Sequence, residues 1–174
     1  MTILNFEFKA KTNNPEELEN KLLQLKPHYV GEDRQIDTYF NVPSGRLKLR
    51  EGNIENALIY YKRPDTAGAK QSEVLLYKHH PDKALKNILI ETLGVKVVVE
   101  KRRRIYLIEN VKFHFDILVG LGTFVEVEAI DKTGDIGKQK LQKQCREYAK
   151  FFGIKPGDYV RESYSDLVFV ARSQ

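Results

Sequence analysis

The sequence has few of the features that stabilise secreted or membrane-embedded proteins. It contains one cysteine, Cys145, which excludes an intrachain disulfide and a thiolate metal cluster. No apolar run approaches the length of a membrane span, and the N-terminus alternates like a strand without the pattern of a signal peptide. Proline (6) and glycine (11) are sparse among the 174 residues, and no linker or repeat divides the chain. We therefore expect one cytoplasmic domain, residues 1–174, with no membrane partner.

Charge, in contrast, is plentiful. Lys and Arg total 29 against 24 Asp and Glu, which gives a net charge of +5. This balance favours anionic partners but does not choose among nucleic acid, membrane lipid and phosphorylated small molecules. The positions of the charges along the predicted elements are therefore more informative than their sum.

The predicted elements favour an α+β fold. Helices are expected at residues 14–25, 81–93 and 135–152, each with an apolar face or terminal capping residues such as Pro15, Gly94 and Gly153. Strands are expected at residues 3–11, 34–40, 46–51, 57–63, 70–77, 95–108, 111–118 and 122–130, with a short final strand at residues 164–170. Short connections, such as a hairpin at Glu109-Asn110, imply antiparallel pairing. Eight such strands predict a closed antiparallel β-barrel with about three helices packed outside.

Charged side chains recur on one face of strand after strand. In RLKLR, for example, Arg46, Lys48 and Arg50 alternate with Leu47 and Leu49. For a single strand, the ordinary interpretation is a charged face in water and an apolar face in the core. The repetition over many strands favours the opposite arrangement, in which the charged faces point into the barrel and the helices cover the apolar faces.

The predicted interior combines cations with carboxylates. The carboxylates Glu126 and Glu128 share a face in TFVEVEA, and Glu7 belongs to the charged face of the first strand. A lumen that holds so many cations would repel itself unless a polyanion and a metal ion completed it. Mg²⁺ and Mn²⁺ bind carboxylate and phosphate oxygens, so the pattern predicts a site for a metal-bound polyphosphate.

Several motifs occur in a characteristic order: NFEFKAK, QIDTYFNVP, GRLKLRE, LIYYKRP, EKRRRIY, FHFDILVGLGTFVEVE and ESYSDLV. Over nearly the whole chain this order resembles the CYTH superfamily, the triphosphate tunnel fold shared by class IV adenylate cyclases and thiamine triphosphatases. LGTFVEVE and YSDL look closest to the class IV cyclase branch. The resemblance implies an eight-stranded barrel that binds ATP or another organic or inorganic triphosphate in its interior.

The resemblance also implies roles for individual residues. Metal ions, Mg²⁺ or Mn²⁺, are expected at Glu7, Glu126, Glu128 and Asp116. The phosphates are expected at Lys9, Lys48, Arg50, Lys62, Lys101 and Arg103. Because Lys101 and Arg103 would steady the leaving phosphate and Asp116 would lie near the reacting end, these three are the catalytic candidates. His114, the only histidine on the expected lumen face, is expected to be structural.

One residue departs from the family pattern. The family motif Glu-x-Glu-x-Lys appears here as Asn5-Phe6-Glu7-Phe8-Lys9, so an amide replaces the first carboxylate. An amide oxygen can coordinate a metal ion but carries no charge, which puts the number of metal ions and the catalytic rate in question.

Four functions remain open at this point. An adenylate cyclase that converts ATP to cyclic AMP and pyrophosphate comes first, and a triphosphatase acting on inorganic, thiamine or nucleoside triphosphate comes second. A binding module that retains a polyphosphate without turnover is the third. Nucleic-acid binding through EKRRRIY is the fourth, and the carboxylates interleaved on the same faces speak against it. A homodimer is left open.

Overall fold

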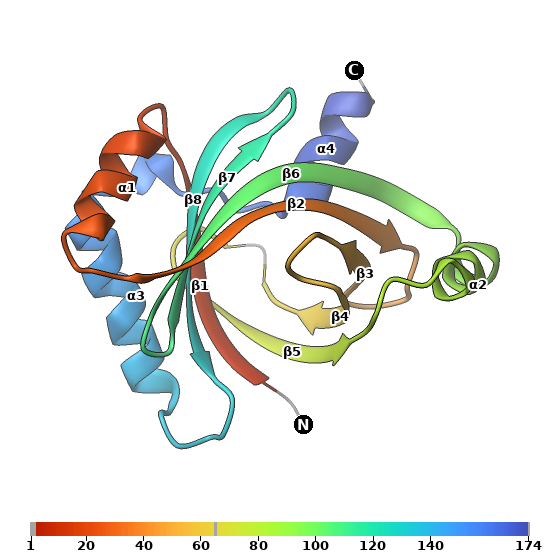
Figure 1. Ribbon diagram of the computed structural model, residues 1–174, viewed down its shortest axis with the longest axis horizontal. Helices are drawn as coiled ribbons and strands as arrows, with labels where there is room; N and C mark the ends of the chain where they lie inside the picture. Colours follow the sequence, from red (N-terminus) through yellow and green to blue (C-terminus); the bar gives the residue numbers. More distant parts are fainter. Residues whose placement is uncertain (1–2, 65, 174) are drawn as a thin grey trace.

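The computed structural model describes residues 3–64 and 66–173 and shows a closed barrel of eight strands (Figure 1). The strands are β1 (Ile3–Lys11), β2 (His28–Phe40), β3 (Arg46–Glu51), β4 (Ala57–Lys62), β5 (Lys70–Lys78), β6 (Val95–Ile108), β7 (Val111–Leu118) and β8 (Gly122–Asp131). The helices are α1 (Pro15–Leu23), α2 (Lys83–Leu93), α3 (Lys138–Phe152) and α4 (Tyr164–Arg172), with a 3₁₀ turn, η1, at Pro156–Asp158.

Every neighbouring pair of strands in the barrel is antiparallel. The order around the barrel is β1-β5-β4-β3-β2-β6-β7-β8, and β8 pairs with β1 to close it. The α+β class and the eight-stranded antiparallel barrel predicted from the sequence are thus confirmed. The helices lie outside the barrel, with α1 and α3 on one side and α2 at the far end of β2 and β6 (Figure 1). None of the helices among the described residues has both the length and the apolar character needed to cross a membrane.

The main hydrophobic core lies between the outside of the barrel and the helices α1 and α3. Phe113 and Phe115 of β7 point outward and make edge-on contacts with Phe152 of α3. Leu141 and Cys145 of α3 are fully buried in the same cluster. Period-two alternation then places the intervening residues of β7 in the lumen. The predicted inversion of polar and apolar faces is therefore present.

The C-terminal segment forms a helix and not the predicted strand. Ser163 and Asp166 make a capping box: the Ser163 hydroxyl accepts the Asp166 N–H at 3.2 Å, and the Asp166 carboxylate accepts the Ser163 N–H at 3.4 Å. The α4 helix follows at once. The strand prediction for residues 164–170 is wrong because this S-x-x-D signal, which starts a helix, outweighs the β-branched residues that come after it.

Some element boundaries differ from the predicted ones for local reasons. The third helix begins at Lys138, three residues after its predicted start, because the Asp131 carboxylate accepts backbone N–H groups from Gly134 and Gly137 and holds this segment as a loop. The predicted strand 34–40 is part of a longer strand, β2, that begins at His28. The hairpin at Glu109-Asn110 is confirmed, with Glu109 at a positive φ of 51°.

Candidate active site in the barrel interior

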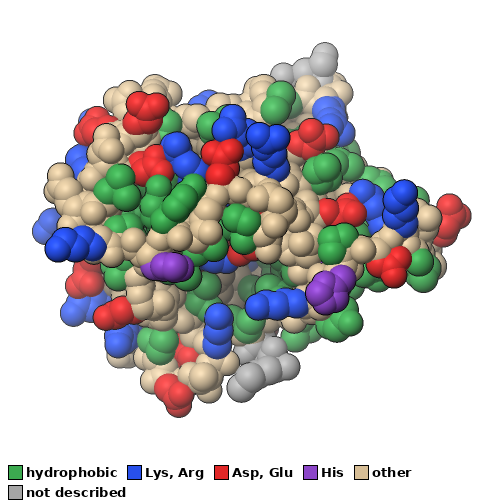
Figure 2. All heavy atoms as spheres, viewed as in Figure 1, with side chains coloured by type: hydrophobic (Ala, Val, Ile, Leu, Met, Phe, Trp, Pro, Cys, Tyr) green, Lys and Arg blue, Asp and Glu red, His purple; other side chains and the backbone are tan. Residues whose placement is uncertain are grey.

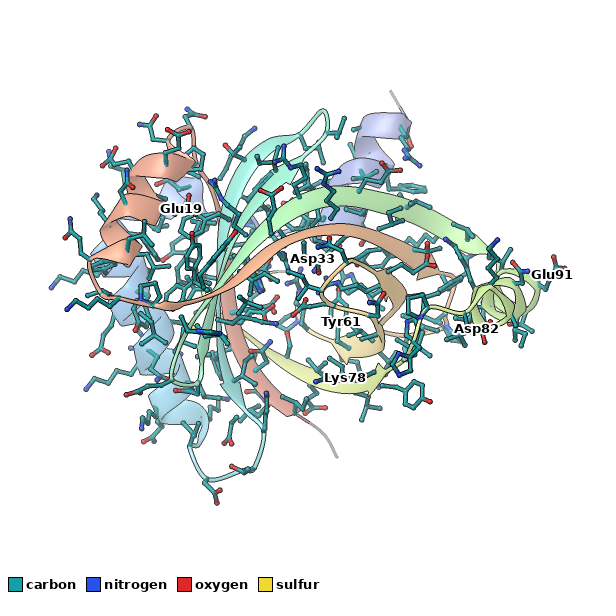
Figure 3. The ribbon with its side chains drawn as sticks, in the orientation of Figure 1. Glu19, Asp33, Tyr61, Lys78, Asp82 and Glu91 are labelled. Atoms are coloured by element: carbon teal, nitrogen blue, oxygen red, sulfur yellow. The ribbon has the colours of Figure 1, made fainter. Side chains whose placement is uncertain are left out.

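The interior of the barrel is a cavity of about 1010 Å³. Among the described residues, nine Lys and Arg side chains but only four Glu side chains line it. Figure 3 shows the labelled side chains of Asp33 and Tyr61 inside the ring of strands. With this excess of positive charge and walls of low dielectric constant, the cavity is suited to a ligand with several negative charges.

The cavity has an open end and a closed end. The open end is lined by partly exposed apolar side chains, such as Leu76 at 42% exposed with Ile3 and Ile130 nearby in the register of the strands, and by the cations Lys78 and Lys132 at its rim. At the closed end, Tyr164 of α4 lies against the cavity and is 5% exposed, and Lys101 is 4% exposed. A ligand would therefore enter from the apolar end and extend toward α4.

The predicted metal-binding carboxylates lie between these two ends. Glu7 of β1 pairs across the ladder with Glu128 of β8, and Lys9 pairs with Glu126. Although burial opposes ionisation, Lys9 and Arg103 hold the pKa of Glu126 well below its usual range. Burial, together with the carboxylates of Glu126 and Glu7, raises the pKa of Glu128 to about 8. A carboxylate pair of this kind retains a proton until a cation arrives to compensate its charge.

The main cation cluster lies on the opposite wall and is organised by one carboxylate, Asp37 of β2. Lys48 and Lys101 donate to Asp37 at 3.1 and 2.7 Å, and Arg50 donates to both of its oxygens at 2.8 Å. Burial opposes the ionisation of Asp37, but Arg50, Lys101 and Lys48 hold its pKa well below the usual range. Three cations around one carboxylate leave a local excess of positive charge, and oxygen-rich anions are its natural ligands.

Lys101 is the most deeply buried lysine of this cluster. Burial lowers its pKa to about 7; Asp37 opposes that effect, while the neighbouring Arg50, Arg103 and Lys48 add to it. A polyanion bound beside Lys101 would reverse the balance and restore a charged ammonium group.

Arg103 and Asp116 form a tight ion pair near the closed end. Two hydrogen bonds of 2.6 Å join the guanidinium group to both carboxylate oxygens, and the Tyr164 hydroxyl donates to Asp116 at 2.7 Å. Arg103 also lies 3.3 Å from Glu126, and Lys9 lies 4.0 Å from the centre of the Tyr164 ring. Asp116, proposed from the sequence as a metal ligand, thus orients Arg103 in this structure.

Lys62 does not lie in the tunnel. It is an exposed residue on the outer face of β4, and the next residue, Arg63, lines the cavity and contacts Glu7. The lumen position predicted for Lys62 is wrong because both faces of LIYYKR carry a tyrosine followed by a cation. Alternation alone did not choose between the faces. The pairing of Lys48 with Ile59 places Tyr61, and not Tyr60, on the inner wall.

The remaining predicted residues line the cavity or lie beside it: Glu7, Lys9, Lys48, Arg50, Lys101, Arg103, Glu126 and Glu128 line it, and Asp116 lies behind Arg103. Sequence reasoning missed Asp37, which lies inside the quoted motif QIDTYF, and Glu55, a loop residue that accepts from Arg50 at 3.0 Å and contacts Lys112. The alternation Asp33, Gln35, Asp37 was a usable signal for β2, whereas Glu55 precedes its strand and follows no periodic pattern.

Two buried polar groups beside the carboxylates lack partners in the part of the chain that the structure describes. The Asn5 side-chain oxygen has no hydrogen bond, and neither ring nitrogen of His114 has one. Such groups are uncommon in protein interiors because each costs free energy. Oxygen and nitrogen donors next to Glu7, Glu126 and Glu128 are the donor set that a divalent cation uses, so these residues fit a metal site.

The outward side of the basic segment EKRRRIY is neutralised locally. Arg102 pairs with Glu32 at 2.8 Å, and Arg104 pairs with Glu19 at 2.6 Å. On the face shown in Figure 2, basic and acidic side chains are interspersed. These two arginines therefore do not form a basic patch for a nucleic acid.

Comparison with known proteins agrees with this geometry. The CYTH domain matches residues 4–164. The chain belongs to the CYTH family. A relative in Methanocaldococcus jannaschii, named "Putative adenylate cyclase", is 26% identical over 175 residues, which cover 95% of this chain and 98% of the relative.

Solved structures of other proteins share the CYTH fold. A Pyrococcus horikoshii OT3 protein has a TM-score of 0.77 with 26% identity, covering 94% of this chain and 98% of that one. A Hippeastrum protein has a TM-score of 0.59 with 14% identity, covering 99% of this chain and 96% of that one, and it is described as a putative adenylyl cyclase with a dominant triphosphatase activity. At that identity, the second likeness shows the fold alone.

Proposed function

We propose that this CYTH protein is a metal-dependent enzyme that converts ATP to 3′,5′-cyclic AMP and pyrophosphate. The observation that carries the proposal is the order of the groups along the tunnel: a partly apolar open end, then the carboxylates with the Asp37 cation cluster on the facing wall, and Lys101 buried nearest α4. The name of the Methanocaldococcus jannaschii relative supports the same activity.

The order of the groups suits an organic triphosphate better than an inorganic one. Val74 and Leu76 of β5 and Ile130 of β8 line the open end and would contact an apolar base and sugar. Inorganic triphosphate has no part that would use this lining. The size of the cavity, about 1010 Å³, is at the upper end of ordinary small-molecule sites and admits a whole nucleotide.

The same order supports reaction at the α-phosphorus. A nucleotide that enters with its phosphates first places the α-phosphate beside Glu126 and Glu128, near the apolar end. Its β- and γ-phosphates then reach the cluster of Lys48, Arg50 and Lys101. Attack at the α-phosphorus by the ribose 3′-hydroxyl makes the β- and γ-phosphates the leaving group, and these three cations would stabilise the departing pyrophosphate.

The remaining tunnel residues have supporting roles. Arg103, which is held by Asp116 and lies on the strand next to that of Asp37, would contact the phosphates, and Arg63 would neutralise Glu7 or a phosphate oxygen. The carboxylates of Glu7, Glu126 and Glu128, with the Asn5 oxygen, would hold the divalent metal ion. When bound there, Mg²⁺ or Mn²⁺ would polarise the phosphate oxygens and offset their charge.

Hydrolysis of a triphosphate is the second candidate. The tunnel residues that would hold a nucleotide for cyclisation also suit attack by water on the terminal phosphorus. The Hippeastrum protein, which shares the fold, is described with dominant triphosphatase activity. The two reactions differ in their products and not in the residues that bind the phosphates.

The test is to incubate the protein with ATP and, separately, with inorganic triphosphate, each with Mg²⁺ or Mn²⁺, and to resolve the products. Cyclic AMP with pyrophosphate supports the proposal, orthophosphate supports the triphosphatase, and tight binding without products indicates a binding module. Lys101→Met should reduce product formation by about 10²-fold, since it removes a buried cation from the leaving group. Arg102→Met, on the outer face of the same strand, is the matched control and should change it little.

A further inference from the structure

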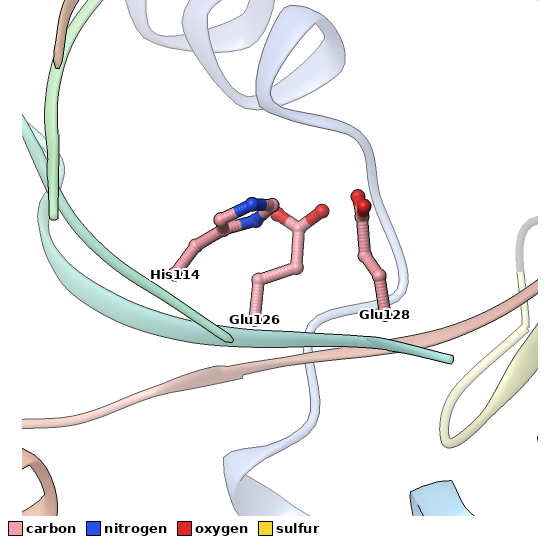
Figure 4. Close-up of side chains that lie close together, drawn as sticks. All are labelled: His114, Glu126 and Glu128. Atoms are coloured by element: carbon pink, nitrogen blue, oxygen red, sulfur yellow. The ribbon is translucent and has the colours of Figure 1, made fainter. Parts of the chain in front are cut away.

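His114 lies beside the carboxylates of Glu126 and Glu128, and its ring makes no hydrogen bond within residues 3–64 and 66–173. It is directly opposite Glu126 in the ladder of β7 and β8. One ligand atom from each of His114, Glu126 and Glu128 lies within 4.8 Å of the others, and Figure 4 shows the three side chains rising from the same wall of the barrel. The imidazole ring is 1% exposed.

A buried imidazole normally makes at least one hydrogen bond, because leaving both nitrogens unpaired costs the full desolvation of each. Among the described residues, neither nitrogen of His114 has such a bond. The side chains around it on the inner wall are Arg103, Lys112, Glu126 and Glu55, and all four are engaged in ion pairs of their own. A bound metal ion that accepts a nitrogen ligand would give the ring the partner that the protein itself does not provide.

We propose that His114 is a nitrogen ligand of the metal centre, together with Glu126 and Glu128, and that it makes this centre select Mn²⁺ over Mg²⁺. The proposal rests on the metal-dependent function proposed above and adds a ligand to it. His114 was expected from the sequence to be structural, and its position at the carboxylates replaces that expectation.

The preference follows from the ligand types. Mg²⁺ requires hard oxygen ligands, binds imidazole poorly and gives up its water molecules reluctantly. Mn²⁺ also favours carboxylate oxygen but, as a first-row transition-metal ion, accepts imidazole nitrogen more readily than Mg²⁺, and Co²⁺ and Zn²⁺ accept it more readily still. Asn5 strengthens the argument, because a neutral amide in place of a carboxylate removes charge that a purely electrostatic Mg²⁺ site would use.

The test uses the unmodified protein, loaded with Mn²⁺ and without any nucleotide. Pulsed electron paramagnetic resonance of bound Mn²⁺ detects a directly coordinated nitrogen through its magnetic coupling. We expect a nitrogen coupling that changes from the ¹⁴N to the ¹⁵N pattern when the protein is produced with ¹⁵N-labelled histidine. Absence of a histidine coupling in bound Mn²⁺ would overturn the proposal, and no variant is needed to reach that result.

Variants then assign the nitrogen. His114→Phe keeps a ring of similar size without a ligand atom. It should remove the coupling and weaken Mn²⁺ binding by about tenfold or more in calorimetry, while Mg²⁺ binding changes far less. His79→Phe is the matched control, because His79 also lines the cavity and has an unpartnered buried nitrogen, and it should keep the coupling. Coupling that survives in His114→Phe and disappears in His79→Phe would contradict the proposal.

The outcome is separable from that of the proposed enzyme activity. If the protein shows the His114 coupling but converts no triphosphate, the proposed activity is contradicted and the assignment of His114 as a metal ligand is supported. If the protein makes cyclic AMP but shows no histidine coupling, the proposed activity is supported and the assignment of His114 as a metal ligand is contradicted.

Discussion

The two faces of the barrel wall differ in what they contribute to this protein. On β7, Phe113 and Phe115 point outward and pack under α3, whereas His114 and Asp116 point inward and contact charged groups. The outer face buries apolar area, which stabilises the fold. The inner face buries charges, and buried ion pairs roughly offset their own desolvation cost at best.

This contrast teaches that stability and function are divided between alternate residues of the same strands. A substitution on the outer face should reduce the free energy of unfolding and leave the chemistry of the folded fraction alone. A substitution on the inner face should alter ligand binding or turnover, and with one exception leave the fold in place. Four predictions test this division, from the largest expected effect to the smallest.

The largest effect is expected for Glu126→Gln. The change removes the ionised carboxylate that faces Lys9 and lies 3.3 Å from Arg103, so metal-dependent turnover should fall by about 10³-fold or more. The measurement is the rate of product formation with ATP and Mn²⁺. Glu100→Gln, at an exposed position of β6, is the control and should keep its activity.

The thermal unfolding midpoint of Glu126→Gln should stay close to that of the wild type, since loss of the Glu126 charge lowers the pKa of Glu128 and lets that carboxylate ionise in its place. Full activity in Glu126→Gln would remove this residue from the site. Global unfolding of the variant would show that the inner face is needed for the fold and would break the comparison.

Phe113→Ala should have the largest effect on stability. Phe113 is fully buried, and its ring lies 4.7 Å from that of Tyr148 and 6.2 Å from that of Phe152. Truncation should reduce the free energy of unfolding by about 3–5 kcal/mol, from lost burial and a residual cavity. Denaturant titration measures this loss. The turnover number per folded molecule should be unchanged, and a selective loss of turnover in fully folded protein would contradict the division.

Asp37→Asn is the exception on the inner face. It leaves Lys48, Arg50 and Lys101 without their carboxylate and should cost about 3 kcal/mol of stability at pH 7. Added inorganic triphosphate should restore much of this stability by taking the place of the carboxylate among the cations.

The pH dependence of that cost has a definite sign. The neighbouring cations hold the pKa of Asp37 in the folded state well below its usual range. Its contribution is therefore fully present above the unfolded pKa of about 3.9, and it is lost as the pH falls through the lower folded value. The stability difference between the wild type and Asp37→Asn should be constant near pH 6 and shrink below about pH 4. A difference that grows in acid would contradict this assignment.

The smallest effect separates two adjacent cations of the β4 segment. Arg63→Met should weaken the binding of inorganic triphosphate by about tenfold, because it removes one cation from the tunnel. Lys62→Met, one residue earlier and on the outer face, should leave the affinity unchanged. Calorimetric titration of both variants measures the difference, and the reverse result would show that this strand faces the other way.

The sequence was sufficient for the architecture because the strands carry a strong period-two pattern. Alternation in RLKLR and KFHFDI, together with short connections, predicted the closed barrel and its inverted faces. It failed at α4, where the capping box of Ser163 and Asp166 decided between helix and strand. Such local hydrogen bonds compete with β propensity and are not visible in a count of apolar residues.

The site was predictable where one face of a strand is clearly charged and the other clearly apolar. That condition holds for Lys48, Arg50 and Glu126. It fails for LIYYKR, where alternation allowed either Lys62 or Arg63 to point into the barrel. Alternation in β2 could have included Asp37 among the candidates, but neither Asp37 nor Glu55 could be ranked from the sequence, because part of their importance comes from Lys101 and Lys112, on strands distant in the chain. Contacts of this kind depend on the register of the barrel and not on local spacing.

The most direct test of the central claim is a crystal structure of the protein with Mn²⁺ and the α,β-methylene analogue of ATP. We expect the triphosphate inside the barrel, with its α-phosphate at Glu126 and Glu128 and its terminal phosphates at Lys48, Arg50 and Lys101. A nucleotide bound on the outer surface, or one inside the barrel with its base toward α4, would contradict this expectation.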